Sequence, residues 1–234
     1  GITFAGTPTF PDGSIAVADL DIDGGTDIGA ALVDADLMIV DDGAGGTNRK
    51  ATMSRLATYM GTKIGGGMEF IASSGAISDG TASVAFTQFD ASKYDHYKFF
   101  FQHVIPVTDS VYLLGQSSTD GGSSYDSTNG DYHYGGITDS TGFTMHRPDN
   151  ALGSDTNEFG VSGEFNLFAP HNTSSYTYGF AHTVHMETDG YLIGNHTNDV
   201  SVRLAAEDID AIKFIMSSGN IESGEITMFG IVNS

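Results

Sequence analysis

One change of character along this 234-residue chain constrains its fold most strongly. A single short segment near the N-terminus has helical periodicity, and after Gly61 the sequence becomes a long Gly-, Ser-, Thr- and Asp-rich body of short alternating segments. Period-two alternation indicates strands, and many short strands between polar turns are typical of sandwiches. The sequence therefore predicts a mainly β protein: an N-terminal extended arm with one short helix, followed by a jelly-roll-like antiparallel β-sandwich.

Composition favours one large β domain with an appendage over two full-sized domains. The 31 glycines supply turns, and 39% hydrophobic residues with 15 phenylalanines are enough to fill one core. We predict that residues 1–64 form the arm and a strand-turn-helix adaptor, and that residues 68–234 form the sandwich. The run Gly65-Gly66-Gly67 is expected to be the hinge between them, because glycine leaves the backbone free.

Charge limits the classes of partner. The formal net charge is −21, which argues against binding to nucleic acid because that needs a basic footprint. No apolar run reaches membrane-spanning length, so membrane insertion is not expected. The chain has no cysteine, which excludes disulfides and thiol chemistry.

The adaptor segment begins with an apolar run, Leu37 to Val40, that ends in Asp41-Asp42-Gly43 and a glycine-rich turn. A basic start follows, and then a helix is predicted over residues 52–60, with Thr52 as its N-cap and Gly61 as its C-terminal stop. Its apolar residues recur at i, i+3, i+4 and i+7 and therefore share one face: Met53, Leu56, Ala57 and Met60. A helix this short is marginal alone in water, so we expect this face to dock.

Basic residues concentrate around the same helix. Arg49, Lys50, Arg55 and Lys63 are four of the nine cations in the chain. They fit a solvated helix face, or a helix that docks on an acidic surface such as a neighbouring copy of the chain. Candidate assembly residues are Arg49, Lys50, Met53, Arg55, Leu56 and Met60.

Strands are expected at short intervals after residue 68. Residues 97–107 read as a central strand, and residues 111–116 are expected to pair with it across the intervening turn. Residues 158–168 are expected to alternate, with four apolar side chains inward: Phe159, Val161, Phe165 and Leu167. Residues 176–186 are expected to alternate in the same way, with their larger apolar side chains inward: Tyr176, Tyr178, Phe180, Val184 and Met186.

No motif for catalysis, a cofactor or a metal stands out, so we predict that the chain is not an enzyme, with no catalytic, cofactor-binding or metal site. Asp19, Asp21 and Asp23 imitate the start of a calcium loop, but the twelfth position is Ala30 instead of a bidentate glutamate. We favour an acidic edge strand, whose charges discourage aggregation, over a calcium site here. The eight histidines do not have the spacing of a zinc site.

One loop, residues 117–136, interleaves aromatic side chains with small polar residues. Tyrosine offers a flat apolar face and a hydroxyl, which suits contact with a sugar or a protein surface. The alternative is a long hairpin whose tyrosines pack back on the sandwich. The candidate surface-binding residues are Tyr125, Tyr132, His133 and Tyr134.

Three stretches of the chain resemble virion proteins of tailed bacteriophages. DADLMIVDDGAGGTNRKATMSRLATYMG (34–61) is similar to an adaptor found in their fibres. FDASKYDHYKFFFQHVIPVTDSVYLLGQSSTDGGSSYDS (89–127) is similar to a stretch of their structural modules. SGNIESGEITMFGI (218–231) resembles their closing strand.

The resemblance implies a fibre-type virion structural protein, attached by its N-terminal arm and presenting a β-sandwich to the host. It also implies a homotrimer with other virion proteins as neighbours, a host surface glycan or protein as a further partner, and assembly in the bacterial cytoplasm. The first alternative is a capsid decoration or cement protein. The second is a carbohydrate-binding module, and the third is an enzyme such as a polysaccharide depolymerase.

Overall fold

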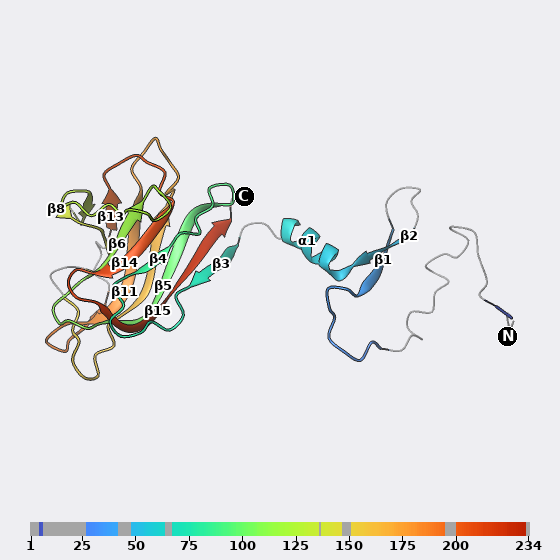
Figure 1. Ribbon diagram of the computed structural model, residues 1–234, viewed down its shortest axis with the longest axis horizontal. Coiled ribbons are helices and arrows are strands. Elements are labelled where there is room, and N and C mark those ends of the chain that lie inside the picture. The colour runs from blue at the N-terminus through green and yellow to red at the C-terminus, as the bar shows by residue number, and fades with distance from the viewer. Residues whose placement is uncertain are drawn as a thin grey trace. The chain divides into compact units, whose positions relative to one another are not determined.

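The computed structural model describes residues 5–6, 27–41, 48–63, 67–135, 137–146, 151–194 and 200–232. The chain divides into two compact units, residues 1–65 and residues 66–234 (Figure 1). Within the described residues the chain is mainly β, with one short N-terminal helix and antiparallel sheets packed as a sandwich. The predicted fold class is confirmed. Most of the predicted arm, including Asp19, Asp21 and Asp23, lies outside the described residues.

The N-terminal unit is a hairpin followed directly by a helix. Strands β1 (Leu37–Asp41) and β2 (Asn48–Thr52) pair antiparallel, and α1 (Met53–Lys63) begins at the next residue. The prediction of a strand, a turn and a helix missed β2. Arg49 and Lys50, which were expected just before the helix, lie on this strand.

Helix α1 begins directly after Thr52, as predicted, but its first-turn donors have other acceptors and it ends later than predicted. The Met53 and Ser54 N–H groups donate to the Asp36 and Asp34 carbonyls, so the segment before β1 satisfies the free donors of the first turn. The Thr52 hydroxyl contacts the Ser54 hydroxyl, 2.9 Å away. At the other end the helix continues through Gly61 to Lys63, so Gly61 does not stop it.

The larger unit, hereafter the body, contains two sheets in its described residues. The nine-stranded sheet has the order β3-β15-β5-β10-β11-β13-β7-β8, with β12 paired to β11. Its strands are β3 (Met68–Ser73), β5 (Tyr94–Pro106), β7 (Tyr132–Tyr134), β8 (Ile137–Ser140), β10 (Val161–Phe168), β11 (Tyr178–Met186), β12 (Leu192–Gly194), β13 (Val200–Arg203) and β15 (Ile221–Val232).

The smaller, four-stranded sheet has the order β4-β14-β6-β9 in the described residues. Its strands are β4 (Val84–Phe86), β6 (Leu113–Ser118), β9 (Phe143–Thr144) and β14 (Ala211–Met216). Residues 111–116 were expected to pair with residues 97–107, and this was wrong. The turn after β5 carries the chain from one sheet to the other, so β6 pairs with β14 and β9, and β5 pairs with β10 and β15.

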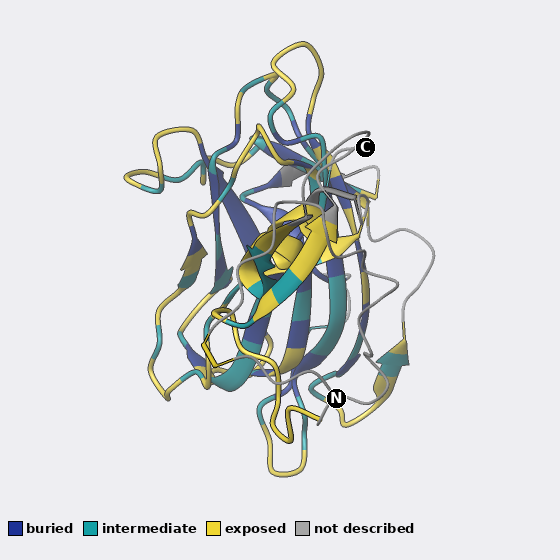
Figure 2. Cartoon of the chain, turned by 90° about the vertical axis from the view of Figure 1, so that its right-hand side faces the viewer, coloured by how far each residue is buried: buried dark blue, intermediate teal, exposed yellow. Residues whose placement is uncertain are grey.

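Aromatic rings from both sheets form the core. Phe99 and Phe165 of the larger sheet contact Phe214 and Phe143 of the smaller one, with ring centres 5.1 Å apart for Phe99–Phe214 and 5.5 Å for Phe143–Phe165. All four side chains are fully buried. Ring pairs at these distances stabilise beyond the area they bury. Figure 2 shows the contrast between the largely buried strands of the body and the exposed helix and hairpin of the N-terminal unit.

Strand β11 faces the opposite way from the prediction. Gly179, Ala181, Thr183 and His185 point inward, and the larger Tyr178 and Phe180 point outward. The reason is the occupied space beneath the strand: a Cβ on Gly179 would lie 2.6 Å from the Phe165 ring and 2.5 Å from the Asn166 carbonyl oxygen. Only a residue without a side chain fits there, which fixes the phase of β11 and turns its aromatic residues outward.

This packing predicts that Gly179→Ala destabilises the body by about 1–3 kcal/mol, the usual cost of overpacking. Gly194→Ala in β12 is the matched control, because a Cβ there meets nothing within 4 Å. Urea unfolding of the two variants measures the difference. Equal free energies of unfolding for both variants would contradict the assigned phase of β11.

Candidate functional site

The predicted assembly residues all lie in the N-terminal unit, on two elements. Arg49 and Lys50 lie on β2, opposite Val40 and Ile39 of β1. The other four lie on α1: Met53, Arg55, Leu56 and Met60. Met53 is half-buried, and Arg49, Lys50, Arg55, Leu56 and Met60 are exposed.

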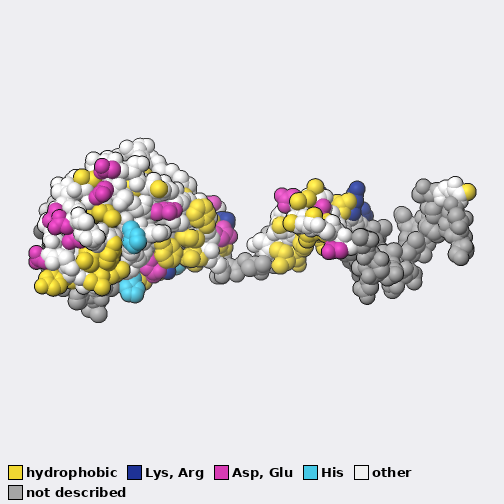
Figure 3. Space-filling view, turned by 90° about the horizontal axis from the view of Figure 1, so that it is seen from below, with side chains coloured by type: hydrophobic (Ala, Val, Ile, Leu, Met, Phe, Trp, Pro, Cys, Tyr) yellow, Lys and Arg dark blue, Asp and Glu magenta, His cyan; other side chains and the backbone are white. Residues whose placement is uncertain are grey.

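None of the N-terminal residues whose burial is described (27–40 and 49–61) is buried. Leu37 and Ile39 on the hairpin are 59% and 60% exposed, and Tyr59 on the helix is 58% exposed. Apolar side chains of the body and of this unit are visible at the surface in Figure 3. A lone two-stranded hairpin and an 11-residue helix are each marginal in water, so this unit lacks the burial that would hold it together alone.

The predicted surface loop is anchored to the body at two of its four candidate residues. Tyr132 is fully buried, and its hydroxyl contacts the Ser117 hydroxyl at 2.7 Å. Burial raises the pKa of Tyr132 to about 12, so the phenol stays protonated. Tyr125 lies under the Lys213 ammonium, 4.5 Å from its ring centre. The structure thus corrects the assignment of Tyr132 to a binding surface, because its side chain has no access to a ligand.

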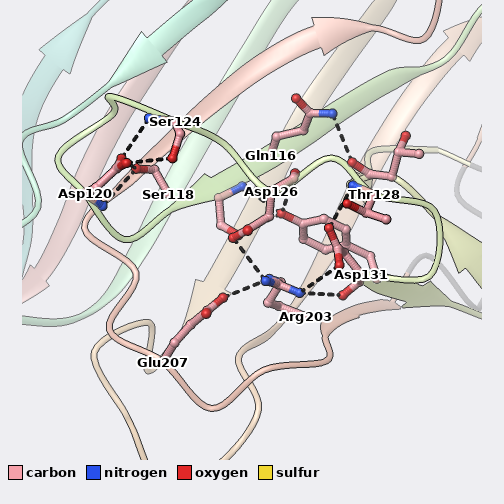
Figure 4. A network of polar contacts seen from close by, with 12 residues as sticks. Gln116, Ser118, Asp120, Ser124, Asp126, Thr128, Asp131, Arg203 and Glu207 are labelled. Carbon is pink, nitrogen blue, oxygen red and sulfur yellow. Dashed lines mark hydrogen bonds and ion pairs between the residues drawn. The ribbon is translucent and has the colours of Figure 1, made fainter.

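A buried arginine that the sequence analysis did not single out holds this loop. Arg203 of β13 is 7% exposed, and its guanidinium lies 3.1 Å from the Asp126 carboxylate and 3.6 Å from that of Asp131 (Figure 4). Its Nε lies 2.9 Å from Glu207 as an ion pair that is not aligned as a hydrogen bond. The guanidinium also lies over the Tyr132 ring. Asp126 and Asp131 belong to the loop, so their contacts with Arg203 fix the loop to the sheet. Removing the arginine would leave these carboxylates without their cation.

Asp120 organises the turn of the same loop. Its carboxylate accepts hydrogen bonds from the Ser124 N–H and hydroxyl and from the Ser118 hydroxyl, at 2.6–2.8 Å. The Gly121 N–H donates to the Asp210 carboxylate. The bonds from Ser124, with help from Ser118, lower the pKa of Asp120 to about 2.

Histidine 171 joins a hydrogen-bonded chain at one end of the body. Its Nδ1 lies 2.7 Å from the Asp208 carboxylate, and its Nε2 lies 3.2 Å from the Tyr97 hydroxyl, which also accepts the Asp90 N–H. Burial raises the pKa of Tyr97 to about 12. The phenol is therefore a protonated group that ties loops to the core, and the arrangement lacks the lowered pKa of an activated nucleophile.

The outer surface of the nine-stranded sheet carries two adjacent rows of residues, which we call the aromatic face. Directly paired residues of an antiparallel sheet share a face, so the strand register defines each row. The first row crosses seven strands: His133, Val202, Tyr178, Phe168, His96, Ile231 and Met68.

The second row lies two residues along each strand: Val200, Phe180, Asn166, Lys98, Phe229 and Phe70. Within the two rows, Phe168 stacks on Tyr178 and on Phe180 with ring centres 5.3 and 5.8 Å apart. Phe229 contacts Phe70 edge-on at 5.8 Å. These two rows are therefore mostly hydrocarbon, whereas a solvated face of an antiparallel sheet usually carries polar residues.

His133 and Tyr134, the other two candidate loop residues, lie at the end of this face. They line a shallow hollow of about 360 Å³ together with Tyr178, Val200 and Val202. The candidate loop residues are thus separated. Tyr125 and Tyr132 pack against the body, His133 is the last residue of the aromatic face, and Tyr134 follows it in the lining of the hollow.

Comparisons with known proteins identify no family for this chain. No protein-family model matches the chain, and no curated protein matches it. Among the described residues, no group of three or more histidine, aspartate or glutamate side chains is arranged to hold a metal ion. No described helix is both long and apolar enough to span a membrane.

The Asp120 turn predicts a specific acid response. Because the pKa of Asp120 is lowered in the folded state, its contribution to stability is complete above its ordinary pKa near 3.8 and is lost as the pH falls through about 2. A carbon-13 NMR titration should therefore give Asp120 a midpoint near 2, and Ser124→Ala should raise that midpoint. A wild-type midpoint at or above 3.8 would contradict the described turn.

Proposed function

We propose that the chain is a structural component of a tailed-bacteriophage virion, attached through its N-terminal unit and presenting the body outward. One observation carries the proposal: a folded hairpin-helix unit in which no residue of described burial is buried. Such a unit needs contact with other polypeptides to hide Leu37, Ile39 and Leu56 from water. A part that is completed only by assembly suits a particle component.

Charge supports docking by this unit. Residues 43–65 contain Arg49, Lys50, Arg55 and Lys63 and no acidic residue, in a chain with a net charge of −21. Of these, Arg49, Lys50 and Arg55 are exposed. A locally basic, apolar surface is complementary to an acidic protein surface, which speeds encounter and fixes orientation. Other virion proteins and neighbouring copies of this chain are the proposed partners.

The residues that carry the phage resemblance have structural roles here. Asp34 and Asp36 supply the carbonyls at the start of α1. Asp120 organises its turn, and Gly230 lies where a Cβ would clash with the Tyr94 ring at 2.3–2.6 Å. The resembling motifs thus specify a turn, a helix start and a strand contact, which supports a shared module that presents surfaces. A homotrimer and a contact with host glycan or protein remain part of the proposal.

The proposal predicts that Leu56→Asp removes the chain from virions. A carboxylate in the apolar docking face is costly to bury, so the copy number per particle should fall at least tenfold while the body stays folded. Double charge reversal, Arg49→Glu with Arg55→Glu, should act in the same direction. Quantitative mass spectrometry of purified particles of the encoding phage gives the copy number.

Thr58→Asp is the matched control for this test. It adds the same charge to the same helix, three positions from Arg55 and off the Met53–Leu56–Met60 face. Thr58→Asp should leave incorporation unchanged. Wild-type chain absent from virions would overturn the proposed function, and normal incorporation of Leu56→Asp would overturn the docking role of α1. Cryo-electron microscopy of the particles then assigns the chain to a fibre or to the capsid surface.

A further inference from the structure

We propose that the aromatic face of the nine-stranded sheet is the interface through which the bodies of neighbouring copies of this chain pack together. The inference rests on the assembly role proposed above and assigns it a second surface, separate from the N-terminal unit. The occupant is a second copy of the chain. Extent, charge and ring geometry each support this assignment.

The face is large enough for a stable contact. Phe70, Tyr178 and Phe180 are 63%, 56% and 38% exposed. At 150–250 Å² for each aromatic side chain, these three alone leave roughly 300 Å² uncovered. A standard interface buries about 800 Å² on each partner, so these three rings alone would supply more than a third of it. The largest apolar patch on a typical monomer measures about 300–600 Å² and is often functional, and three residues of this face already reach that range.

The charge of the face favours another copy of the same chain. None of its thirteen residues is acidic, and its one cation, Lys98, is neutralised by Glu164 at 2.9 Å. Residues 66–234 carry 21 acidic and five basic residues, so two bodies repel each other through most of their surfaces. A basic partner would be drawn to those carboxylates. Copies that share the negative charge can approach closely only where carboxylates are missing or paired. The aromatic face has no carboxylate of its own, and Glu164 beside it is paired with Lys98.

Ring geometry at the Phe70 end of the face argues for a protein over a sugar. There Phe229 contacts Phe70 at an interplanar angle of 78° and the neighbouring Phe100 at 89°, whereas Phe168 at the other end is nearly parallel to Tyr178 and Phe180. Sugars stack on flat exposed rings and need hydrogen-bonding groups beside them. Edge-on rings with neighbouring valine, isoleucine and methionine side chains form ridges that suit interdigitation with another protein surface.

A pair of valines tests the proposal. Val200 lies on the face and is 53% exposed, whereas Val107 follows β5 outside both rows and is 46% exposed. Val200→Asp and Val107→Asp therefore introduce the same charge at similar exposure. Both are made in the full chain that carries Leu56→Asp, so that docking by α1 does not contribute to the measured mass.

Sedimentation equilibrium should show that the Leu56→Asp chain self-associates, that added Val200→Asp weakens association at least 100-fold, and that added Val107→Asp changes it less than threefold. Thermal melts confirm that each variant is folded. A monomeric Leu56→Asp chain, or equal effects of the two valine substitutions, would overturn the proposal. Neither result depends on whether the chain is found in virions, so failure of the interface is distinguishable from failure of the proposed function.

A photo-crosslinking phenylalanine analogue at position 178 gives a test that does not depend on the valine variants. It should join two copies through peptides of the aromatic face, and the same analogue at position 107 should not. Crosslinks that stay within one chain would contradict the interface. The face would be assigned to glycan instead if the chain is a monomer and added oligosaccharides block the crosslinks that position 178 forms within that chain.

Discussion

The contact between the Phe165 ring and the backbone at Gly179 determines what the rest of the body presents to its surroundings. The ring fills the space in which an inward side chain of position 179 would lie, 2.6 Å from a Cβ there. Strand β11 must therefore turn its small residues to the core and its aromatic residues outward. Tyr178 and Phe180 then meet Phe168 across the β10–β11 pairing, and the aromatic face follows. A contact that fills the core thus also creates the apolar exterior.

The two units of the chain share this physical property although they are built differently. The N-terminal unit exposes Leu37, Ile39 and Leu56 because it is too small to have an interior. The body has a complete core of interlocking rings and still exposes Phe70 and Tyr178, because its sheet is apolar on both sides. The described part of the loop at residues 117–135 is held to the sheet by polar contacts, with Arg203 between Asp126 and Asp131. These features together describe a chain whose folding leaves surfaces for other chains to cover.

The fold class and most strands were predictable because residues 158–168 alternate strongly and residues 211–216 form a short apolar run between polar residues. The phase of β11 was not predictable from the sequence. The prediction placed the larger apolar side chains inward, and the Phe165 ring already fills the space that an inward side chain at position 179 would need. Strand β2 was missed because Asn48, Arg49 and Lys50 have polar side chains, and pairing with β1 supplies the pattern. Of the candidate site residues, the positions on α1 followed from helical spacing. The burial of Tyr132 could not be predicted, because it depends on contacts with Ser117 and with Arg203. Arg203 is far away in the sequence, and no motif marks either residue.

The central claim is that the apolar surfaces of this chain are completed by other polypeptide chains. Hydrogen exchange of the wild-type chain across a range of protein concentrations, with the mass measured in parallel, tests it most directly. The account predicts that the amides of residues 37–40 and 49–61 exchange rapidly in the monomer and gain protection only as assembled species form, since none of these residues is buried. A monomer in which these amides are already strongly protected would contradict it.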